Sequence, residues 1–370
     1  MGNVPNLRFP EFSGEWNTER LENLTVSIGD GLHSTPEYCE QGDYCFVNGN
    51  NIIDGKVSIN EKTLRVTKKE AYKHNAALLK ADTILMSING TIGNVALYNG
   101  ENIMLGKSAC YINPSSHIVR EYLFHILSSH RIQAYFQGEL TGTTIKNLSL
   151  KAIRGSKVSI PSNDEQKKIA KLLSLLDERI ATQTKIIDKL QSLIKELSIS
   201  LTTKEKPNTA LSQCLKCYSS TLQESEVLPI GLYKVFGANG KVGYTDLPQM
   251  NGDAILIIKD GSGVGTTSYA RGEFSVIGTL NYLTAKDNYD LRYLYFALSV
   301  FNFQPYKTGM AIPHIYFKDY GNAKIYCPPL AEQKRVANVL GKLESKIFVE
   351  QDFLASFNLQ KRYLLSQMFI

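Results

Sequence analysis

One stretch of the sequence occurs twice, and this repeat constrains the fold more than any other feature. The residues "IPSNDEQKKIAKLLSLLDERI" at 160–180 return as "CPPLAEQKRVANVLGKLESKI" at 327–347, and an offset of 167 positions matches Gln166 to Gln333. A fixed offset over many positions indicates an internal duplication. Other positions at which both copies hold the same residue are Pro161, Glu165, Lys167, Ala170, Leu173, Leu176 and Ile180.

Each copy begins like an α-helix. Pro161 and Pro328 can end an incoming strand, and Asn163 or Asp164 can cap a helix in the first copy. Glu165 adds negative charge to the first turn, where the helix dipole favours it. The sequence therefore predicts a helix start after each proline.

After both starts, inward-facing positions recur in steps of three and four and form a heptad seam. Both copies hold a polar residue at the same level, Gln183 and Glu350, as register-setting positions of coiled coils often do. We expect the two helices to pair with each other; the alternative is that each packs only on its own domain. The first seam consists of Leu173, Leu176, Ile180, Gln183, Ile187, Leu190, Ile194, Leu197 and Leu201. The second consists of Leu340, Leu343, Ile347, Glu350, Leu354, Phe357, Lys361, Leu364 and Met368.

The segments that precede the two helices are also alike. "KADTILMSINGTIGNVALY" from residue 80 resembles "NGDAILIIKDGSGVGTTSY" from residue 251, with Gly90 and Gly261 at an offset of 171. Both are typical of a buried strand, a glycine turn and a returning strand. We expect an α+β fold with the order domain, helix, domain, helix. The expected bounds are 1–157 for the first domain, 158–206 for the first long helix, 207–326 for the second domain and 327–370 for the second long helix.

Composition indicates a folded chain of at least two domains. With 370 residues, of which 43% are hydrophobic and 21% charged, the chain is globular in composition and too long for one ordinary core. No apolar run reaches the ~18 to 20 residues of a membrane helix, and the first residues lack a secretion signal. We therefore expect a cytoplasmic protein with no membrane partner. The net charge of +6 allows a nucleic-acid partner without requiring one.

No motif predicts a catalytic or metal site. "LGKSAC" at 105–110 has the GKS of a phosphate loop but Glu101 where its first glycine should stand, and no helix pattern follows "DGSGVGTT" at 260–267. The adjacent residues His33 and Ser34 point apart on an extended loop, so they do not predict a nucleophile with its base. We expect a chain without an active site, metal or cofactor of its own.

Loops with short polar side chains beside glycine recur in both domains. Asn, Ser, Thr and Lys side chains read base edges and contact phosphates, and glycine lets the backbone approach them. One such loop is usually only a turn, so the hypothesis of DNA binding depends on their repetition in two paired domains. The candidates in the first domain are His33, Ser34, Thr35, Asn48, Asn50, Asn51, Ser87, Asn89, Thr91, Thr143, Thr144 and Lys146. Those in the second are Asn239, Lys241, Lys259, Ser262, Thr266, Thr267, His314 and Lys318.

Together these features resemble the specificity subunit of type I restriction-modification systems. The resemblance rests on the order domain, helix, domain, helix and on "VPNLRFPEF", "DGLHSTPEY", "FVNGNNIIDGK", "DTILMSINGTIG", "VFGANGKVGYTD" and the two "PxxxEQ" helix starts. It implies two target recognition domains with mixed or antiparallel sheets and helices. It also implies that a long antiparallel two-helix coiled coil separates them, with pseudo-two-fold symmetry.

The resemblance further implies a non-catalytic subunit that reads an asymmetric, bipartite target in double-stranded DNA. Its helices would dock two adenine methyltransferase subunits that use S-adenosylmethionine, and restriction subunits that use ATP with Mg can join them. Glu350 and Lys361 depart from an apolar seam, so we expect the pairing to be weakest at their levels. Two alternatives are a protein-interaction scaffold without DNA contact and a stand-alone DNA-modifying enzyme.

Overall fold

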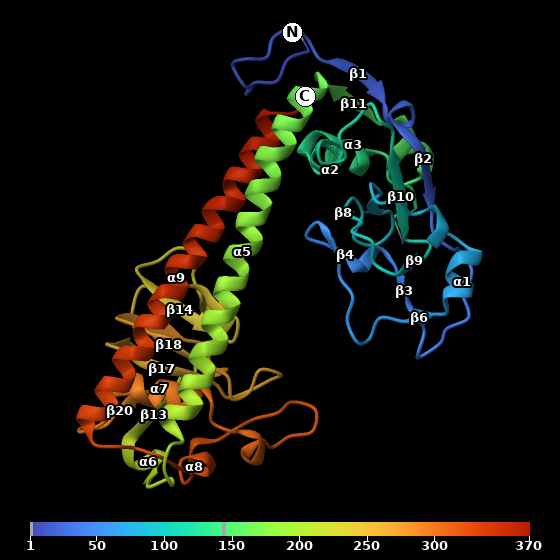
Figure 1. Cartoon of the computed structure of the whole chain (residues 1–370). Helices are drawn as coiled ribbons and strands as arrows, with labels where there is room; N and C mark the ends of the chain where they lie inside the picture. The colour runs from blue at the N-terminus through green and yellow to red at the C-terminus, as the bar shows by residue number, and fades with distance from the viewer. Residues whose placement is uncertain (1–2, 143–145) are drawn as a thin grey trace. The chain divides into compact units, whose positions relative to one another are not determined.

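The structure, a computed structural model, describes residues 3–142 and 146–370. The chain divides into two compact units, Met1–Thr182 with Leu354–Ile370, and Gln183–Phe353. Two long helices, α5 (Asn163–Thr202) and α9 (Leu330–Gln367), contribute to both units (Figure 1). Each unit therefore contains one of the expected domains together with part of each long helix.

The first unit has an α+β fold. Its strands are β1 (Asn17–Arg20), β2 (Thr25–Asp30), β3 (Tyr44–Val47), β4 (Ile52–Ile53), β5 (Lys56–Val57), β6 (Arg65–Val66), β7 (Ile84–Ser87), β8 (Val95–Leu97), β9 (Ile103–Leu105), β10 (Ala109–Pro114) and β11 (Lys157–Ile160). Its shorter helices are α1 (Lys68–Lys73), α2 (Arg120–Leu127), α3 (His130–Gly138) and α4 (Leu150–Gly155), with 3-10 turns at Leu21–Leu24, Gly49–Asn51 and Ala76–Leu78. The main sheet has the antiparallel order β2-β10-β7-β8, while the sheet β6-β3-β9 contains a parallel pair, β3 with β9.

The second unit repeats this plan. Its strands are β12 (Thr209–Ala210), β13 (Leu215–Ser219), β14 (Tyr233–Gly237), β15 (Gly240–Thr245), β16 (Met250–Asn251), β17 (Ala254–Ile258), β18 (Thr267–Ala270), β19 (Glu273–Val276), β20 (Leu280–Ala285) and β21 (Lys324–Ile325). Its shorter helices are α6 (Leu211–Cys214), α7 (Leu291–Ser299) and α8 (Phe317–Tyr320), with 3-10 turns at Glu224–Glu226 and Gln304–Tyr306. The order β13-β20-β17-β18 is again antiparallel, and the sheet β15-β14-β19-β16 again contains a parallel pair, β14 with β19.

The strand register shows how closely the two main sheets correspond. Ile84 of β7 lies opposite Ile112 of β10, and Ile255 of β17 lies opposite Leu283 of β20. Both members of the second pair follow those of the first by 171 positions. The offset that is visible in the sequence is therefore also an offset in sheet pairing.

One inner strand of each main sheet, β7 in the first unit and β17 in the second, is buried on both faces. Side chains alternate across a sheet, so neighbouring residues enter different cores. Ile84 and Met86 belong to the core that includes Trp16, whereas Leu85 belongs to a second core with residues of β3 and β9. In the second unit, Ile255 likewise enters a different core from the residue that follows it, Leu256. A continuous apolar run is what a strand between two cores requires.

The glutamine of the first repeated helix start joins the helix to the domain before it. Gln166 is 2% exposed. Its amide oxygen accepts a hydrogen bond from the N–H of Val119 at 2.9 Å, and its amide nitrogen donates to the carbonyl of Pro161 at 3.1 Å. Beside it, the hydroxyl of Tyr122 in α2 donates to the carbonyl of Ser159 at 2.7 Å. These bonds fix the start of α5 against the start of α2.

The second unit contains the same junction. The amide of Gln333 accepts from the N–H of Asp290 at 2.9 Å and donates to the carbonyl of Pro328 at 2.8 Å. The hydroxyl of Tyr293 donates to the carbonyl of Tyr326 at 2.7 Å. The repeated glutamine therefore has the same task in both copies, because it satisfies two backbone groups where a helix leaves its domain.

The long helices pack both on their own domains and on each other, antiparallel. Leu173 of α5 and Met368, the residue after α9, share the core of the first unit, and Leu340 of α9 packs in the second unit with Ile194 and Leu197 of α5. No seam position is exposed on either helix, from Leu173 to Leu201 or from Leu340 to Met368. The two helices therefore pair with each other as expected, and because each also packs on a domain, the alternative of packing on the domain alone is wrong.

The polar level of the seam is a hydrogen-bonded layer. Gln183 and Glu350 are 8% and 7% exposed. The Gln183 amide donates to the backbone carbonyl of Glu350 at 3.1 Å and to its carboxylate, which also forms an ion pair with Lys346. In the first unit, Lys361 forms an ion pair with Asp177 of α5 at 2.5 Å. The polar residues of the second seam are therefore paired, so their levels still make contacts between the helices.

The Glu350 layer makes a testable contribution to stability that depends on pH. The hydrogen bonds from Lys346 and Gln183 hold the pKa of Glu350 below its usual value. This stabilisation is complete above the unfolded-state pKa of about 4.3 and is lost as the pH falls through the lower folded-state value. We expect Glu350→Gln to unfold at lower urea concentration than the wild type at pH 7, and the difference to shrink at pH 3. Glu196→Gln, at an exposed position on α5, is the control, and a Glu350→Gln deficit that stays constant with pH would contradict the prediction.

Candidate nucleic-acid interface

In each unit, the loop after an inner strand of the main sheet, β7 or β17, pairs with a second segment. We call this segment the hairpin, and its paired ends are Thr141 with Asn147 in the first unit and Thr308 with His314 in the second. In the first unit, Asn89 follows β7 and forms a backbone bridge with Asn147, which also bridges to Thr141. In the second unit, Asp260 follows β17 and bridges to His314, which also bridges to Thr308. The two arrangements correspond at the offsets of 171 and 167 positions, so the duplication extends to the loops.

Glycine allows the strand-end loops to turn. Gly90 has φ 73° and Gly261 has φ 99°, in the left-handed region that favours glycine. The residue directly after each strand, Ile88 or Lys259, is also bonded to the hairpin. Leu148 N–H donates to the Ile88 carbonyl and Ile315 N–H to the Lys259 carbonyl, both at 2.9 Å. Each loop is therefore held by its hairpin in a defined position.

In the first unit the loop and hairpin border a small polar hollow, which we call the Asn89 hollow, of about 260 Å³. His33 lies at its edge, with Nε2 2.6 Å from Oδ2 of Asp30. The Asn89 side-chain oxygen is buried and accepts no hydrogen bond from the residues that the structure describes. Lys107 adds a positive charge. The hollow is lined by Asp30, His33, Ile88, Asn89, Lys107, Asn147, Leu148, Ser149 and Leu150.

The corresponding hollow of the second unit, the His314 hollow, is larger, at about 810 Å³. Nδ1 of His314 lies 3.1 Å from Oδ1 of Asp260, and both side chains are about one-third exposed, at 33% and 35%. Two cations border it, and Nζ of one of them, Lys318, lies 5.3 Å from the centre of the Tyr316 ring. The hollow is lined by Cys217, Ser219, Lys259, Asp260, Asn281, Ile312, His314, Ile315, Tyr316, Phe317 and Lys318. Burial raises the pKa of the Cys217 thiol to about 11, so this group is neutral near pH 7.

The predicted residues of the first domain divide into surface and supporting positions. Ser34, Thr35, Asn50, Thr91 and Lys146 are exposed. His33 and Asn89 meet at the Asn89 hollow. Thr143 and Thr144 lie outside the described residues.

Three predicted residues of this domain use their side chains in hydrogen bonds within the domain. Ser87 is fully buried; its hydroxyl donates to the Thr91 carbonyl and accepts from the Asn94 N–H, so it shapes the turn from beneath and does not reach the surface. The Asn51 amide bonds the Asn48 N–H and a carbonyl further along the chain, and Asn48 accepts from a serine hydroxyl. The side chains of Ser87 and Asn51 satisfy backbone groups of their own loops, and that of Asn48 accepts from the Ser108 hydroxyl.

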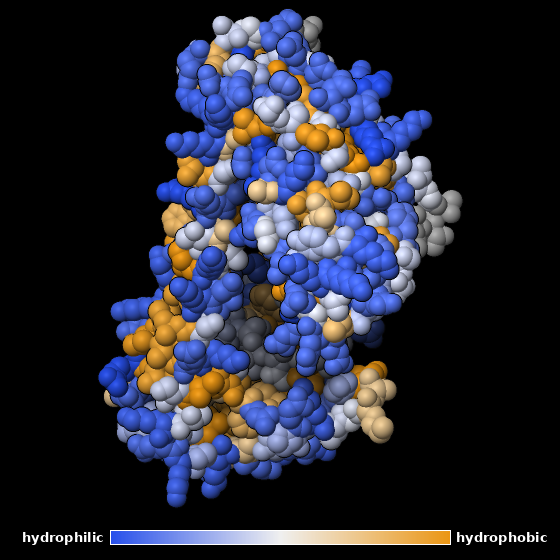
Figure 2. Space-filling view, turned by 45° about the vertical axis from the view of Figure 1, so that its right-hand side comes forward, coloured by the Kyte–Doolittle hydropathy of each residue, from blue (hydrophilic) through white to orange (hydrophobic). Residues whose placement is uncertain are grey.

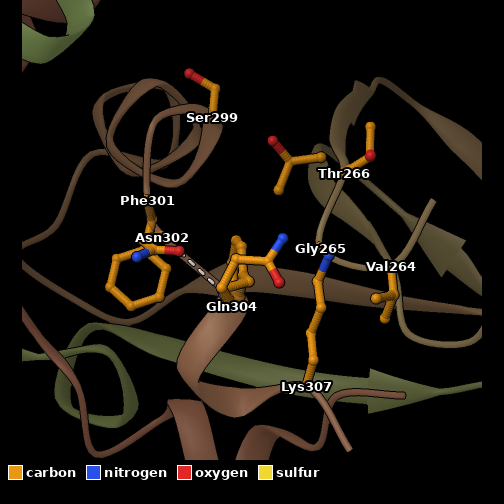
Figure 3. Close-up of a pocket in the computed structure, with 10 residues that line it drawn as sticks. Val264, Gly265, Thr266, Ser299, Phe301, Asn302, Gln304 and Lys307 are labelled. Carbon is orange, nitrogen blue, oxygen red and sulfur yellow. Dashed lines mark hydrogen bonds between the residues drawn. The ribbon is translucent and has the colours of Figure 1, made fainter. Parts of the chain in front are cut away.

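The predicted residues of the second domain lie in three places. Lys259, His314 and Lys318 line the His314 hollow. Thr266 and Thr267 line another cavity, in which Figure 3 labels Thr266, and Ser262 belongs to the same glycine-rich turn. Asn239 and Lys241 lie at the turn between β14 and β15, where the Lys241 ammonium donates to the Tyr244 hydroxyl at 3.0 Å.

The sequence candidates included only one residue of each loop–hairpin pair, Asn89 in the first unit and His314 in the second. Asn147 and Asp260 were not among the candidates, although they occupy the positions that correspond to His314 and Asn89. The signal was present in the sequence, since applying both offsets to each candidate identifies its counterpart.

The hairpin of the second unit ends in a hydrophobic tip. Met310 is fully exposed and Ile312 is 60% exposed. The molecular face in Figure 2 is largely hydrophilic, with hydrophobic residues in separate patches. Exposed apolar side chains beside cations are typical of interaction surfaces, and apolar contacts to thymine methyl groups are one way to read DNA.

The described residues contain neither a metal-binding cluster nor a membrane-spanning helix. Within residues 3–142 and 146–370, no three His, Cys, Asp or Glu side chains gather in a way that could hold a metal ion. In the same ranges, no helix combines the length and apolar character needed to cross a membrane.

Comparisons with known proteins agree with the resemblance seen in the sequence. The type I restriction enzyme MjaIX specificity subunit of Methanocaldococcus jannaschii is 23% identical over 186 residues, which cover 50% of this chain and 43% of that protein. The chain therefore matches less than half of that relative's length. The putative type I restriction enzyme MjaX specificity subunit of the same organism is 24% identical over 397 residues, which cover 94% of this chain and 91% of that protein.

The fold and the family model agree with these relatives. The crystal structure of an S subunit of a type I restriction-modification system from M. genitalium superposes with a TM-score of 0.68 at 19% identity, and the match covers 99% of both chains. That likeness confirms the expected fold class. The model of the type I restriction modification DNA specificity domain matches residues 14–192 and 216–355, more than half of the chain and part of both units. With its duplicated units and paired helices, this chain belongs to the family of type I restriction modification DNA specificity domains.

Proposed function

We propose that this chain is the non-catalytic DNA-reading subunit of a type I restriction-modification complex, and that each unit reads one half of an asymmetric target in double-stranded DNA. One observation carries the proposal: the same loop–hairpin arrangement is built twice, with Asn89 and Asn147 in one unit and Asp260 and His314 in the other. Asparagine amides suit adenine, whereas a carboxylate accepts from the amino group of cytosine. Equivalent positions with different chemistry are what an asymmetric target requires.

The charge of the second domain supports a reader that acts within a larger complex. Residues 207–326 hold 10 lysines and arginines against 9 aspartates and glutamates, so this domain is nearly neutral. Phosphate neutralisation supplies much of the affinity of DNA-binding proteins. We therefore propose that tight binding also uses basic surfaces of partner subunits.

We further propose that α5 and α9 dock two adenine methyltransferase subunits, and that restriction subunits can join the complex. Large hydrophobic side chains exposed on α9 support a role in docking, because exposed apolar residues on a helix are typical of partner surfaces. They include Val339, Phe348, Val349, Leu359 and Tyr363. In this proposal S-adenosylmethionine, ATP and Mg are bound by the partners, the chain itself holds no cofactor, and the complex works in the cytoplasm.

Deleting the gene for this chain is expected to abolish adenine methylation at one bipartite motif in the host genome. The reason is that methyltransferase subunits without a reading subunit would have no means of selecting that motif. Methylation is mapped across the genome by sequencing that detects modified adenine. The matched control is complementation with the wild-type gene, beside the same gene carrying an early stop codon.

Three outcomes separate the hypotheses. Methylation that persists unchanged after deletion contradicts the proposal. Loss of methylation, with a complex purified on a tag of this chain that binds duplexes with and without the motif equally, favours a scaffold without DNA reading. Methylation by the purified chain without any partner would indicate a stand-alone enzyme.

A further inference from the structure

The second unit contains a cavity of about 340 Å³ between the strand-end turn after β17 and the segment that follows α7. In Figure 3 the side chain of Lys307 extends toward Gly265, with Gln304 on one side and Val264 on the other. The hydroxyl-bearing residues Thr266 and Ser299 lie across the opening. The cavity is lined by Val264, Gly265, Thr266, Thr267, Ser299, Phe301, Asn302, Phe303, Gln304 and Lys307.

The groups that line this cavity suit an anion. None of the described residues that form its wall is acidic, and Lys307 is its one cation among them. The structure pairs Lys307 with no carboxylate among the residues that it describes. The Ser299 hydroxyl donates to the Phe296 carbonyl at 2.8 Å, while Thr266 and Thr267 carry further hydroxyls. A lysine beside hydroxyl and amide donors is a common binding site for a phosphate group.

The first unit fills the corresponding place. Gly93 has φ 87° and Gly265 has φ 91°, and their N–H groups donate to the carbonyls of Ser87 and Ile258, so the two glycines are equivalent. Beside Gly93 lies Gln133. Its amide donates to the Gly93 carbonyl at 2.9 Å and to the carbonyl of Leu127, the last residue of α2, at 2.7 Å. A side chain on Gly93 would collide with Gln133. The first unit thus closes this position with a satisfied amide, whereas in the second Phe303 lies against Gly265 and the cavity beside it is lined by Lys307.

We propose that this cavity binds a backbone phosphate of the DNA target, with Lys307 as its cation and the hydroxyls of Thr266 and Thr267 as further donors. The inference rests on the proposed function and deepens it, because it separates a phosphate contact from the base-reading His314 hollow of the same unit. Contacts to phosphates position a protein on DNA and carry no sequence information directly. Lys307 therefore sets affinity and register, and does not set which bases are read.

The test uses the complex purified from the host on a tag of this chain. Binding of a duplex with the mapped motif and of a scrambled duplex is measured by fluorescence anisotropy over a range of KCl concentrations. We expect Lys307→Ala to weaken both duplexes by a similar factor, roughly three- to tenfold, and to reduce the salt slope by about 0.9. The methylated motif should not change. Lys307→Arg should largely restore binding, and Lys324→Ala, an exposed position on β21, removes the same charge as a control.

Each result decides the inference. Equal binding and equal salt slopes for Lys307→Ala and Lys324→Ala would overturn it while leaving the proposed function intact. A changed motif would assign Lys307 to base reading instead. Inorganic phosphate and ATP are titrated separately, and a Lys307-dependent affinity for ATP above that for the duplex would identify a nucleotide site. A wild-type complex that does not distinguish the motif from the scrambled duplex would contradict the proposed function itself.

Discussion

Gln333→Ala is expected to lower the free energy of unfolding of the second unit by about 2–4 kcal/mol. Gln333 is 2% exposed, and its amide bonds two backbone groups, the N–H of Asp290 and the carbonyl of Pro328. Alanine leaves both without a partner, and an unsatisfied buried polar group costs about 1–3 kcal/mol. The two lost hydrogen bonds lie where α7 and α9 begin. The long helix α9 should therefore separate more easily from the second domain.

Two companion variants make this prediction specific. Gln351→Ala changes an exposed glutamine on the same helix and should have little effect. Gln166→Ala removes the equivalent junction from the first unit, where it bonds Val119 and Pro161. If Gln333→Ala and Gln351→Ala unfold at the same denaturant concentration, the junction does not contribute the stability assigned to it.

The single tryptophan allows the two junctions to be measured separately. Trp16 is buried in the core of the first unit, so its fluorescence reports unfolding there, whereas circular dichroism reports helix loss in both units. Gln166→Ala should move the tryptophan transition to lower denaturant. Gln333→Ala should move a dichroism transition and leave the tryptophan transition in place if the units unfold independently, which also tests whether the chain unfolds in one step.

The helices were predictable because their signals are local and repeated. A proline and a long seam can be read from neighbouring residues, and the duplication supplied a second copy of each signal. The expected cap of the first helix was wrong by one position or more, because α5 already begins at Asn163 and the N–H of Glu165 donates to the Ser162 hydroxyl at 3.4 Å. The task of Gln166 and Gln333 was not predictable, since each accepts a hydrogen bond from a residue more than 40 positions earlier. The sequence marked these glutamines as repeated without indicating what they bond.

The site was less predictable, for a physical reason that Ser87 and Asp260 illustrate. Short polar side chains beside glycine turns can either face solvent or bond the backbone of their own loop. Ser87 does the second, and only its burial in the fold distinguishes it from an exposed serine. Asp260 was passed over as part of a glycine-rich turn, yet it lies against His314 because a distant hairpin returns to the strand end. Pairings between distant loops depend on the whole fold.

Exchanging the first domain for that of another specificity chain is expected to replace one half of the methylated motif and to leave the other half unchanged. The loop–hairpin arrangement of each unit is supported by the cores of its own unit, so the second unit should keep its geometry. Methylation at the original motif should fall below detection and appear at a hybrid motif. The result is read by the same genome-wide mapping of modified adenine.

The design of the exchange must respect the contacts that the first domain makes with the end of α9. Leu7 N–H donates to the Gln367 carbonyl at 3.0 Å, and the rings of Tyr122 and Phe369 lie 5.5 Å apart. Residues 1–157 of the donor chain should therefore keep equivalents of Leu7 and Tyr122, and α5 and α9 stay unchanged. A chimera that carries this chain's own residues 1–157 across the same junctions controls for damage to the fold.

A smaller exchange tests the same idea within the second unit. Asp260→Asn combined with His314→Asn gives the second unit the amide pair of the first, and an amide prefers adenine where a carboxylate accepts from cytosine. We expect a changed preference at a base of the second half-site, at a discrimination cost of about 1–3 kcal/mol for the original base, with the first half-site unaffected. Two outcomes would contradict independent reading by the two units through these loops. The first is that the double substitution changes both half-sites. The second is that neither the domain exchange nor the double substitution alters the motif. A scaffold without DNA contact would give the second of these results, because its partners alone would choose the sequence.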